Sequence, residues 1–105
     1  MAHDKLGRSV VSCTIVDGRA INVAAGTELQ ISSTGLIVDY IIVTAETNNT
    51  GVMTVGASTS VASLTTRRGT PLLAGESVTL VGVDLSAVYY DATVAGDGIT
   101  FTYVY

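Results

Sequence analysis

The side chains that most often carry chemistry are scarce in this chain. It holds one histidine, His3, in a polar N-terminal stretch, and one cysteine, Cys13, in an apolar run typical of a strand. A Ser-His-Asp triad or a Cys-His pair needs nucleophile, base and orienting group held together, and no such set is visible. Zinc sites draw mainly on Cys and His, so zinc is not expected either. The sequence therefore predicts no enzyme and no cofactor.

Three aspartates, Asp84, Asp91 and Asp97, lie in turn-forming segments and could in principle meet around calcium, which prefers oxygen ligands. However, Asp is common in turns because its carboxylate accepts backbone hydrogen bonds. No Asp-x-Asp-x-Asp spacing is present. We therefore expect these residues to shape turns rather than to hold a metal.

The charge balance excludes one class of partner. Nine acidic and five basic residues give a net charge of −4, whereas nucleic-acid binding needs clustered Lys and Arg. The one basic pair, Arg67 and Arg68, precedes Gly69-Thr70-Pro71 and is expected in a loop. The two guanidinium groups either stay in solvent or bind carboxylates of a neighbouring subunit, where Arg can make bidentate, charge-assisted bonds. On the second interpretation Arg67 and Arg68 are interface residues.

Aromatic residues gather near the C-terminus, where Phe101, Tyr103 and Tyr105 alternate with other residues and so share one strand face. This face has two interpretations. The first is packing in the core or against another subunit, with the tyrosine hydroxyls bonded at the rim. The second is a platform for sugar rings, although such platforms usually include Trp, which is missing.

The expected location of the protein depends on two features, a signal peptide and a membrane-spanning segment. No signal peptide is recognisable, so synthesis in the cytoplasm is expected. The most apolar segment, residues 36–43, contains Asp39 and falls far short of the roughly 20 residues that span a bilayer. No membrane partner is expected. Cys13 is expected to be a buried, reduced strand residue, because a lone cysteine has no disulfide partner within the chain.

The C-terminal part of the chain reads as strands separated by turns. Residues 77–81 and 99–105 alternate between polar and apolar side chains, the period of a half-buried strand, and residues 88–90 form a third candidate. Residues 74–76 and 95–98 are rich in Gly and Asp, which favour turns. The pattern predicts a meander of antiparallel strands, with a hairpin at residues 95–98.

The N-terminal part begins with residues 1–7, which lack periodicity and are interpreted as a flexible arm. A strand is predicted at residues 8–16, and Asp17-Gly18 predicts a tight hairpin turn into a second strand at residues 19–23.

The middle of the chain holds the predicted centre of the fold. Residues 38–45 are almost continuously apolar and rich in Ile and Val, which predicts a central strand covered on both faces. Shorter strands are expected at residues 28–32 and 52–55.

Together these elements predict one all-β domain over residues 8–105, an antiparallel β-sandwich of eight or nine short strands, similar to a jelly roll, with little or no helix. The chain has 105 residues, of which 48% are hydrophobic and 13% charged. A domain this small has a large surface relative to its volume and must expose part of that apolar share. The composition therefore predicts a homo-oligomer, for which we expect a trimer.

The order of short motifs over residues 37–105 resembles small structural proteins of tailed bacteriophages, namely capsid decoration (cement) proteins and related β-sandwich modules of head and tail fibres. The motifs are Asn49-Thr50-Gly51, Val55-Gly56, Arg68-Gly69-Thr70-Pro71-Leu72, Ala74-Gly75-Glu76-Ser77-Val78, residues 85–90 and Gly96-Asp97-Gly98 with its aromatic strand. The resemblance implies a non-enzymatic virion protein that binds between subunits of the major capsid protein at the capsid surface. The alternative is a carbohydrate- or receptor-binding module of a phage tail or head fibre.

Overall fold

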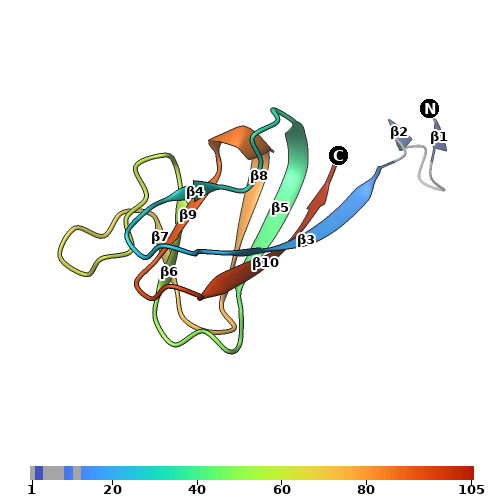
Figure 1. Cartoon of the computed structure of the whole chain (residues 1–105). Coiled ribbons are helices and arrows are strands. Elements are labelled where there is room, and N and C mark those ends of the chain that lie inside the picture. Colours follow the sequence, from blue (N-terminus) through green and yellow to red (C-terminus); the bar gives the residue numbers. More distant parts are fainter. Residues whose placement is uncertain (1, 4–8, 11–12) are drawn as a thin grey trace.

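The computed structural model describes residues 2–3, 9–10 and 13–105. Two four-stranded antiparallel sheets face each other around one core, which confirms the predicted all-β sandwich (Figure 1). Sheet I contains, in spatial order, β3 (Ile15–Ile21), β10 (Gly98–Val104), β5 (Ile37–Ala45) and β8 (Ser77–Asp84). Sheet II contains β4 (Leu29–Gln30), β9 (Tyr89–Ala92), β6 (Met53–Gly56) and β7 (Thr70–Leu72). The helical structure in the described part of the chain is one 3-10 turn, η1 (Leu85–Ala87).

The N-terminal stretch contributes two further strands. β1 (Ala2–His3) pairs antiparallel with β2 (Ser9–Val10). Most of the predicted arm, residues 1 and 4–7, lies outside the described residues. No helix among residues 2–3, 9–10 and 13–105 is long and apolar enough to cross a membrane.

The strands of the two sheets pair in a nested order. β3 pairs with β10, β4 with β9, β5 with β8, and β6 with β7. Consecutive strands β8, β9 and β10 therefore alternate between the sheets, and the predicted meander is wrong. The predicted hairpin at residues 95–98 is wrong as well, because this loop connects sheet II to sheet I. Alternating side chains show that a strand has one buried face, but not which sheet contains it.

The predicted hairpin at Asp17-Gly18 is also wrong. Residues 15–21 form one continuous strand, β3, paired over its full length with β10. Gly18 does not adopt the positive φ of a type I′ turn. Pairing with a strand about 80 positions later in the chain overrides the local turn signal, since seven residues of ladder outweigh one dipeptide preference.

β5 is the central strand, as predicted, because it pairs with β10 on one side and β8 on the other. Its inner side chains Ile41 and Val43 are fully buried in the core. The prediction that both faces are covered is wrong, however. On the outer face, Tyr40 is 39% exposed and Ile42 is 37% exposed.

A distortion at one end of β5 turns additional side chains toward the core. Asp39 and Tyr40 are both exposed, while Val38 and Ile41 on either side are both buried, so the alternation shifts by one residue. Val38 pairs with Val83 and Tyr40 with Val81, while Gly82 between these two partners has φ of 63°, a conformation that favours glycine. The shift brings Val38 into the cluster that fills the space between the sheets.

The core consists of apolar side chains from both sheets, with the largest fully buried ones being Ile41, Met53, Ile99, Val38, Val43 and Val55. Cys13 is not among them. It lies before β3 and is exposed, with Sγ 4.0 Å from Asp39 Oδ2, so the prediction of a buried thiol is wrong. Of the strand predicted at residues 8–16, Ser9–Val10 form β2 and the last two residues belong to β3, while Cys13 lies in neither strand.

Candidate interaction surface

The outer face of sheet I carries three rows of side chains, each running across all four strands. The register fixes the rows, because residues directly opposite one another in an antiparallel sheet point to the same face. The first row, which we call the apolar row, consists of Ile15, Val104, Tyr40 and Val81. The second consists of Asp17, Thr102, Ile42 and Thr79, and the third of Arg19, Thr100, Thr44 and Ser77.

The apolar row is open to solvent at both ends. Ile15 is 71% exposed on β3, and Val81 is 76% exposed on β8. Between them Val104 is buried and Tyr40 is partly exposed, with Ile42 beside it in the next row. Apolar side chains that line up across a sheet form a contiguous patch, and such patches mark interaction sites more often than scattered apolar residues do.

The third row is polar and ends in an ion pair. Arg19 Nε lies 2.6 Å from Glu46 Oε1, and Arg19 Nη2 donates to Glu46 Oε2 at 3.0 Å. The hydrogen bond and the charge of Glu46 raise the pKa of Arg19 above its ordinary value. In the same row, the hydroxyls of Thr44 and Ser77 are hydrogen-bonded at 2.9 Å. The ion pair ties the edge strand β3 to the end of β5.

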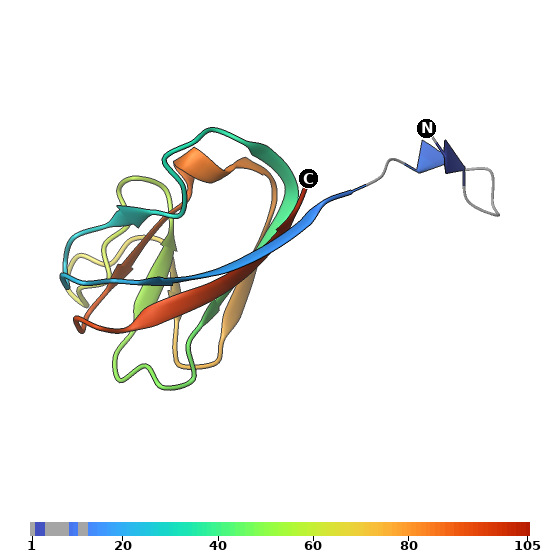
Figure 2. The ribbon, with the colours of Figure 1, turned by 45° about the vertical axis from the view of Figure 1, so that its right-hand side comes forward.

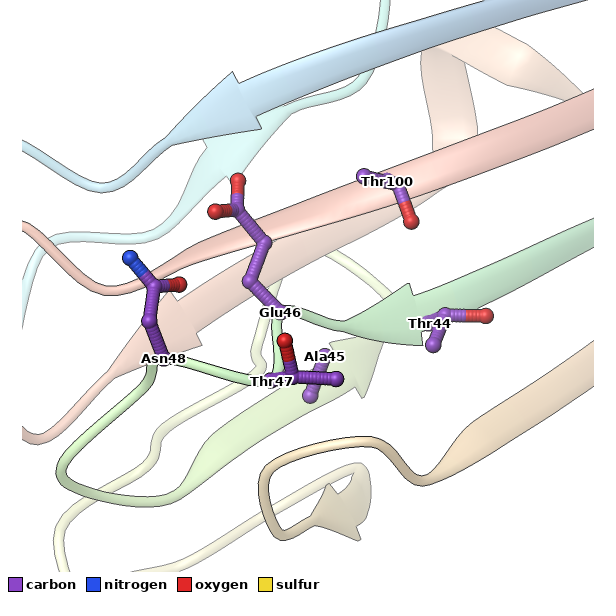
Figure 3. A pocket seen from close by; sticks show the side chains of 6 residues that line it. All are labelled: Thr44, Ala45, Glu46, Thr47, Asn48 and Thr100. Atoms are coloured by element: carbon purple, nitrogen blue, oxygen red, sulfur yellow. The ribbon is translucent and has the colours of Figure 1, made fainter.

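A shallow hollow of about 230 Å³ lies at this end of sheet I (Figure 3). In Figure 3 the Glu46 carboxylate extends over the ribbon of β10. Both oxygens of this carboxylate accept from Arg19, so the hydroxyl and amide groups of the hollow are the ones open to a ligand. It is lined by Thr44, Ala45, Glu46, Thr47, Asn48 and Thr100.

Arg67 and Arg68 lie in the long loop between β6 and β7 of sheet II. Arg67 Nε donates to the carbonyl oxygen of Ala62 at 2.9 Å, so part of this guanidinium closes its own loop. The backbone of Arg68 pairs with Val61, and its side chain is exposed. Of the two cations, Arg68 is therefore the one more available to a partner.

The aromatic residues of β10 lie on the inner side of sheet I. Phe101 and Tyr103 are half-buried against the core, and their rings stack with centroids 6.3 Å apart. The ring of Tyr105, which follows β10, has its centroid 6.1 Å from that of Tyr103, and Tyr105 is exposed. These rings and the arginine pair belong to different sheets, so the structure does not bring the five predicted interface residues together on one surface.

Asp84 ends β8 and Asp97 lies in the loop before β10, but Asp91 lies inside β9, so the prediction that Asp91 shapes a turn is wrong. Each of the three carboxylates accepts a hydrogen bond from a backbone amide. Asp84 Oδ1 accepts from the Ser86 amide at 2.9 Å, Asp91 Oδ2 from the Ala62 amide at 2.8 Å, and Asp97 Oδ2 from the Gly51 amide at 2.8 Å. Hydrogen bonds from the Ser86 side chain and amide, with one from Leu36, lower the pKa of Asp84. No group of three or more potential metal-ligating side chains occurs in the part of the chain that the structure describes.

Sequence reasoning missed the outer face of sheet I, and with it Asp17 and Arg19. The signal was present, because Ile15, Asp17, Arg19 and Ile21 alternate with smaller residues over seven positions. Because Asp17-Gly18 is typical of a hairpin turn, the sequence predicted two strands there and not one alternating strand.

Comparisons with known proteins found no matching family model, no matching curated protein and no matching solved structure.

Proposed function

We propose that this chain is a non-enzymatic structural protein of a virion, a capsid decoration protein that binds between subunits of the major capsid protein and stabilises a phage head. Its location would be the capsid surface, after synthesis in the host cytoplasm. The outer face of sheet I would be the surface that binds the shell.

One observation carries this proposal, namely the open apolar face of the central strand. β5 has the composition of a strand covered on both sides, yet Tyr40 and Ile42 on its outer face stay 39% and 37% exposed. Parallel or doubly buried strands have such nearly continuous apolar runs, whereas a strand facing water alternates cleanly. A flat protein surface, such as that between capsid subunits, would complete the burial.

The strand order supports the same proposal. We infer that the sandwich is a jelly roll, because its eight strands pair from the outside inward, first with last, and divide into two four-stranded sheets. Jelly rolls occur in viral capsid and lectin domains. Since one fold serves many functions, this argument supports the apolar face but cannot replace it.

The energy available from such a contact is sufficient for a protein that binds in many copies. Burying about 300 Å² of apolar surface contributes about 7.5 kcal/mol at roughly 25 cal/mol per Å², before the loss of translational and rotational freedom. Repetition over a shell multiplies the effect, since every copy bridges neighbouring subunits. The expected self-association belongs to the proposal too, although an apolar excess predicts no particular symmetry and the trimer stays a prediction.

Quantitative mass spectrometry of purified virions tests the proposal. A decoration protein is expected at a copy number near that of the major capsid protein. Presence in only a few copies per particle would favour a fibre, and absence from the particle would refute the proposal.

A matched pair of variants tests the surface. Val81→Asp places a charge in the apolar row, while Val23→Asp places the same charge at a valine of equal exposure, 77% against 76%, outside sheet I. Co-sedimentation with capsids lacking the protein should show binding reduced at least tenfold by Val81→Asp and unchanged by Val23→Asp. Equal binding by both variants would exclude this face.

The alternative is a carbohydrate- or receptor-binding module of a phage fibre. The observation that favours it is the shallow hollow beside Glu46, whose lining includes hydroxyl and amide groups that can bond the hydroxyls of a sugar. A glycan array probed with the purified protein, and with Glu46→Gln as control, separates the two functions. Glycan binding lost in the variant would support the alternative.

A further inference from the structure

The edge of sheet I formed by β3 has features that point to a specific occupant. β3 is the outermost strand of its sheet, with β10 on one side and no other strand among the described residues on the other (Figure 2). It is seven residues long and lacks proline and positive φ. Proline or a distorted backbone often blocks an exposed edge strand, because the unpaired amide and carbonyl groups of that strand can otherwise bind another strand. The opposite edge strand, β8, contains the distortion at Gly82.

The hydrogen-bond pattern shows which backbone groups of β3 face this open edge. Thr14 and Tyr105 exchange both of their backbone hydrogen bonds, at 2.7 and 3.1 Å, and the Asn22 amide donates to the carbonyl oxygen of Asp97. In an antiparallel pair, residues alternate between bonding the partner and pointing away from it. The even-numbered residues from Thr14 to Asn22 therefore bond β10. The amide and carbonyl groups of the odd-numbered residues point outward: Ile15, Asp17, Arg19 and Ile21.

We propose that this edge pairs with β3 of a second copy of the chain, antiparallel and about a two-fold axis at Gly18. The sequence of β3, IVDGRAI, is complementary to itself about this glycine. Asp17 of one copy would lie opposite Arg19 of the other, and Ile15 opposite Ile21. Opposite charges and apolar pairs directly across two strands are both stabilising. The inference stands on the geometry of β3 and does not depend on the proposed function.

The backbone pattern and the charges select the same register. A ladder between two β3 edges must pair odd-numbered residues with odd-numbered ones, since only these present free amide and carbonyl groups. The neighbouring two-fold registers meet this condition but place Asp17 opposite Asp17, or Arg19 opposite Arg19. Like charges directly opposite one another are destabilising. The register centred on Gly18 thus combines a full ladder with two Asp–Arg pairs.

The side chains around the axis permit this approach. Two facing glycines would lie in the closer, non-hydrogen-bonded type of pair. The inner side of Gly18 is covered by the Phe101 ring of the same chain, an arrangement known to stabilise glycines at sheet edges. Arg19 uses Nε and one Nη2 hydrogen for Glu46. The remaining guanidinium donors, out of five, are available for the Asp17 carboxylate of the second copy.

Pairing in this way would join two copies of sheet I into one continuous eight-stranded sheet. Because paired residues point to the same face, the apolar rows of both copies would lie on one side. The contact is isologous, so it produces a dimer, in contrast to the trimer expected from composition. Light scattering coupled to size exclusion is expected to give about twice the 10.8 kDa of one chain. A monomer at micromolar concentration, or a trimer, would overturn the proposal.

Hydrogen exchange of the wild-type protein tests the register without any substitution. At high concentration the outward amides of Ile15, Asp17, Arg19 and Ile21 should exchange slowly, and dilution below the dissociation constant should make them fast. The amides of Val16, Gly18 and Ala20 bond β10 and should stay slow at both concentrations. Protection of the outward amides that does not change with concentration would contradict the proposed pairing.

A charge exchange between two variants tests the Asp–Arg pairs. Asp17→Arg and Arg19→Asp each place like charges opposite one another in a homodimer, so each variant alone should dimerise at least tenfold more weakly. Mixed together, they restore opposite charges at both pairs, and a heterodimer should form. Circular dichroism of each variant establishes that it is folded. Dimers of wild-type affinity from either variant alone, or no heterodimer from two folded variants, would refute the register.

Discussion

Gly18 and Phe101 lie directly opposite each other on β3 and β10, and the phenyl ring occupies the space that a side chain at Gly18 would need. A Cβ atom placed on Gly18 would lie 2.5 Å from Phe101 Cζ, much closer than van der Waals contact allows. This relationship explains why a glycine occurs in the middle of a strand, where it is otherwise unfavourable.

We predict that Gly18→Ala destabilises the fold by about 1–3 kcal/mol, the usual cost of overpacking. Urea unfolding followed by circular dichroism measures the change. Gly35→Ala is the matched control, since its nearest contact would be at 3.5 Å, an ordinary separation. Equal stability of Gly18→Ala and the wild type would show that the ring moves aside without cost.

Asp91 and Thr54 form a second informative pair, because they lie opposite each other on β9 and β6 and both are fully buried. Asp91 accepts hydrogen bonds from the Ala62 amide and from Asn22 Nδ2, at 2.8 and 3.4 Å. Thr54 Oγ1 has no hydrogen-bond partner among the described residues. Asp91→Ala should therefore cost about 2–3 kcal/mol, because it leaves a buried amide unsatisfied.

Thr54→Val is the control for this prediction. It keeps the shape of the side chain and removes a hydroxyl without a described partner, so the free energy of unfolding should stay the same or increase. Thermal unfolding of both variants measures the difference. A larger loss for Thr54→Val than for Asp91→Ala would mean that the hydroxyl, not the carboxylate, holds the loop above sheet II.

The lowered pKa of Asp84 predicts how stability depends on pH. The carboxylate accepts hydrogen bonds from the Ser86 hydroxyl and amide and from the Leu36 amide, which favour its charged form. Its stabilising contribution is thus fully present above the ordinary pKa of about 3.9. The contribution is lost as the pH falls through the lower pKa of the folded state.

Asp84→Asn should therefore be less stable than the wild type at pH 7, and the difference should shrink as the pH falls below about 4. Denaturant unfolding between pH 7 and pH 2 measures it. Glu28→Gln removes an exposed carboxylate elsewhere and controls for the change in net charge. A difference for Asp84→Asn that is independent of pH would contradict the role of the charged form.

Arg68 is predicted to contribute to assembly or capsid binding, because it is an exposed cation in an acidic chain. Arg67→Ala/Arg68→Ala should weaken binding more than deletion of residues 1–5, and Arg68→Ala alone should account for most of the loss. Added salt should reduce the difference from the wild type, since screening weakens exposed ion pairs. Sedimentation with capsids at low and high salt measures both effects.

Arg67→Ala provides the control. Arg67 donates to the carbonyl oxygen of Ala62, so its removal should loosen the loop between β6 and β7 and leave capsid binding nearly unchanged. If the shortened chain binds poorly while the double variant binds like the wild type, the N-terminal residues are the anchor.

The sequence alone determined the class of the fold and its central strand. Alternating and β-branched segments predicted an all-β sandwich, and the apolar run at residues 38–45 predicted β5, observed as Ile37–Ala45. These features depend on local patterns, because side-chain period and apolar content are properties of consecutive residues. The role of Asp84 was interpretable for the same reason, since its bond from the Ser86 amide two residues later is local. Asp91 and Asp97 bond amides 29 and 46 positions away, which no local pattern predicts.

Only the tertiary structure decided which strands pair and which faces stay open. The Asp17-Gly18 signal predicted a turn, but pairing with β10 and the Phe101 ring made the segment a strand. The apolar run of β5 predicted cover on both faces, but the second sheet covers only one. Both outcomes depend on residues far apart in the chain, whose mutual positions no local pattern encodes. The open edge of β3 and the apolar row became visible only once those positions were known.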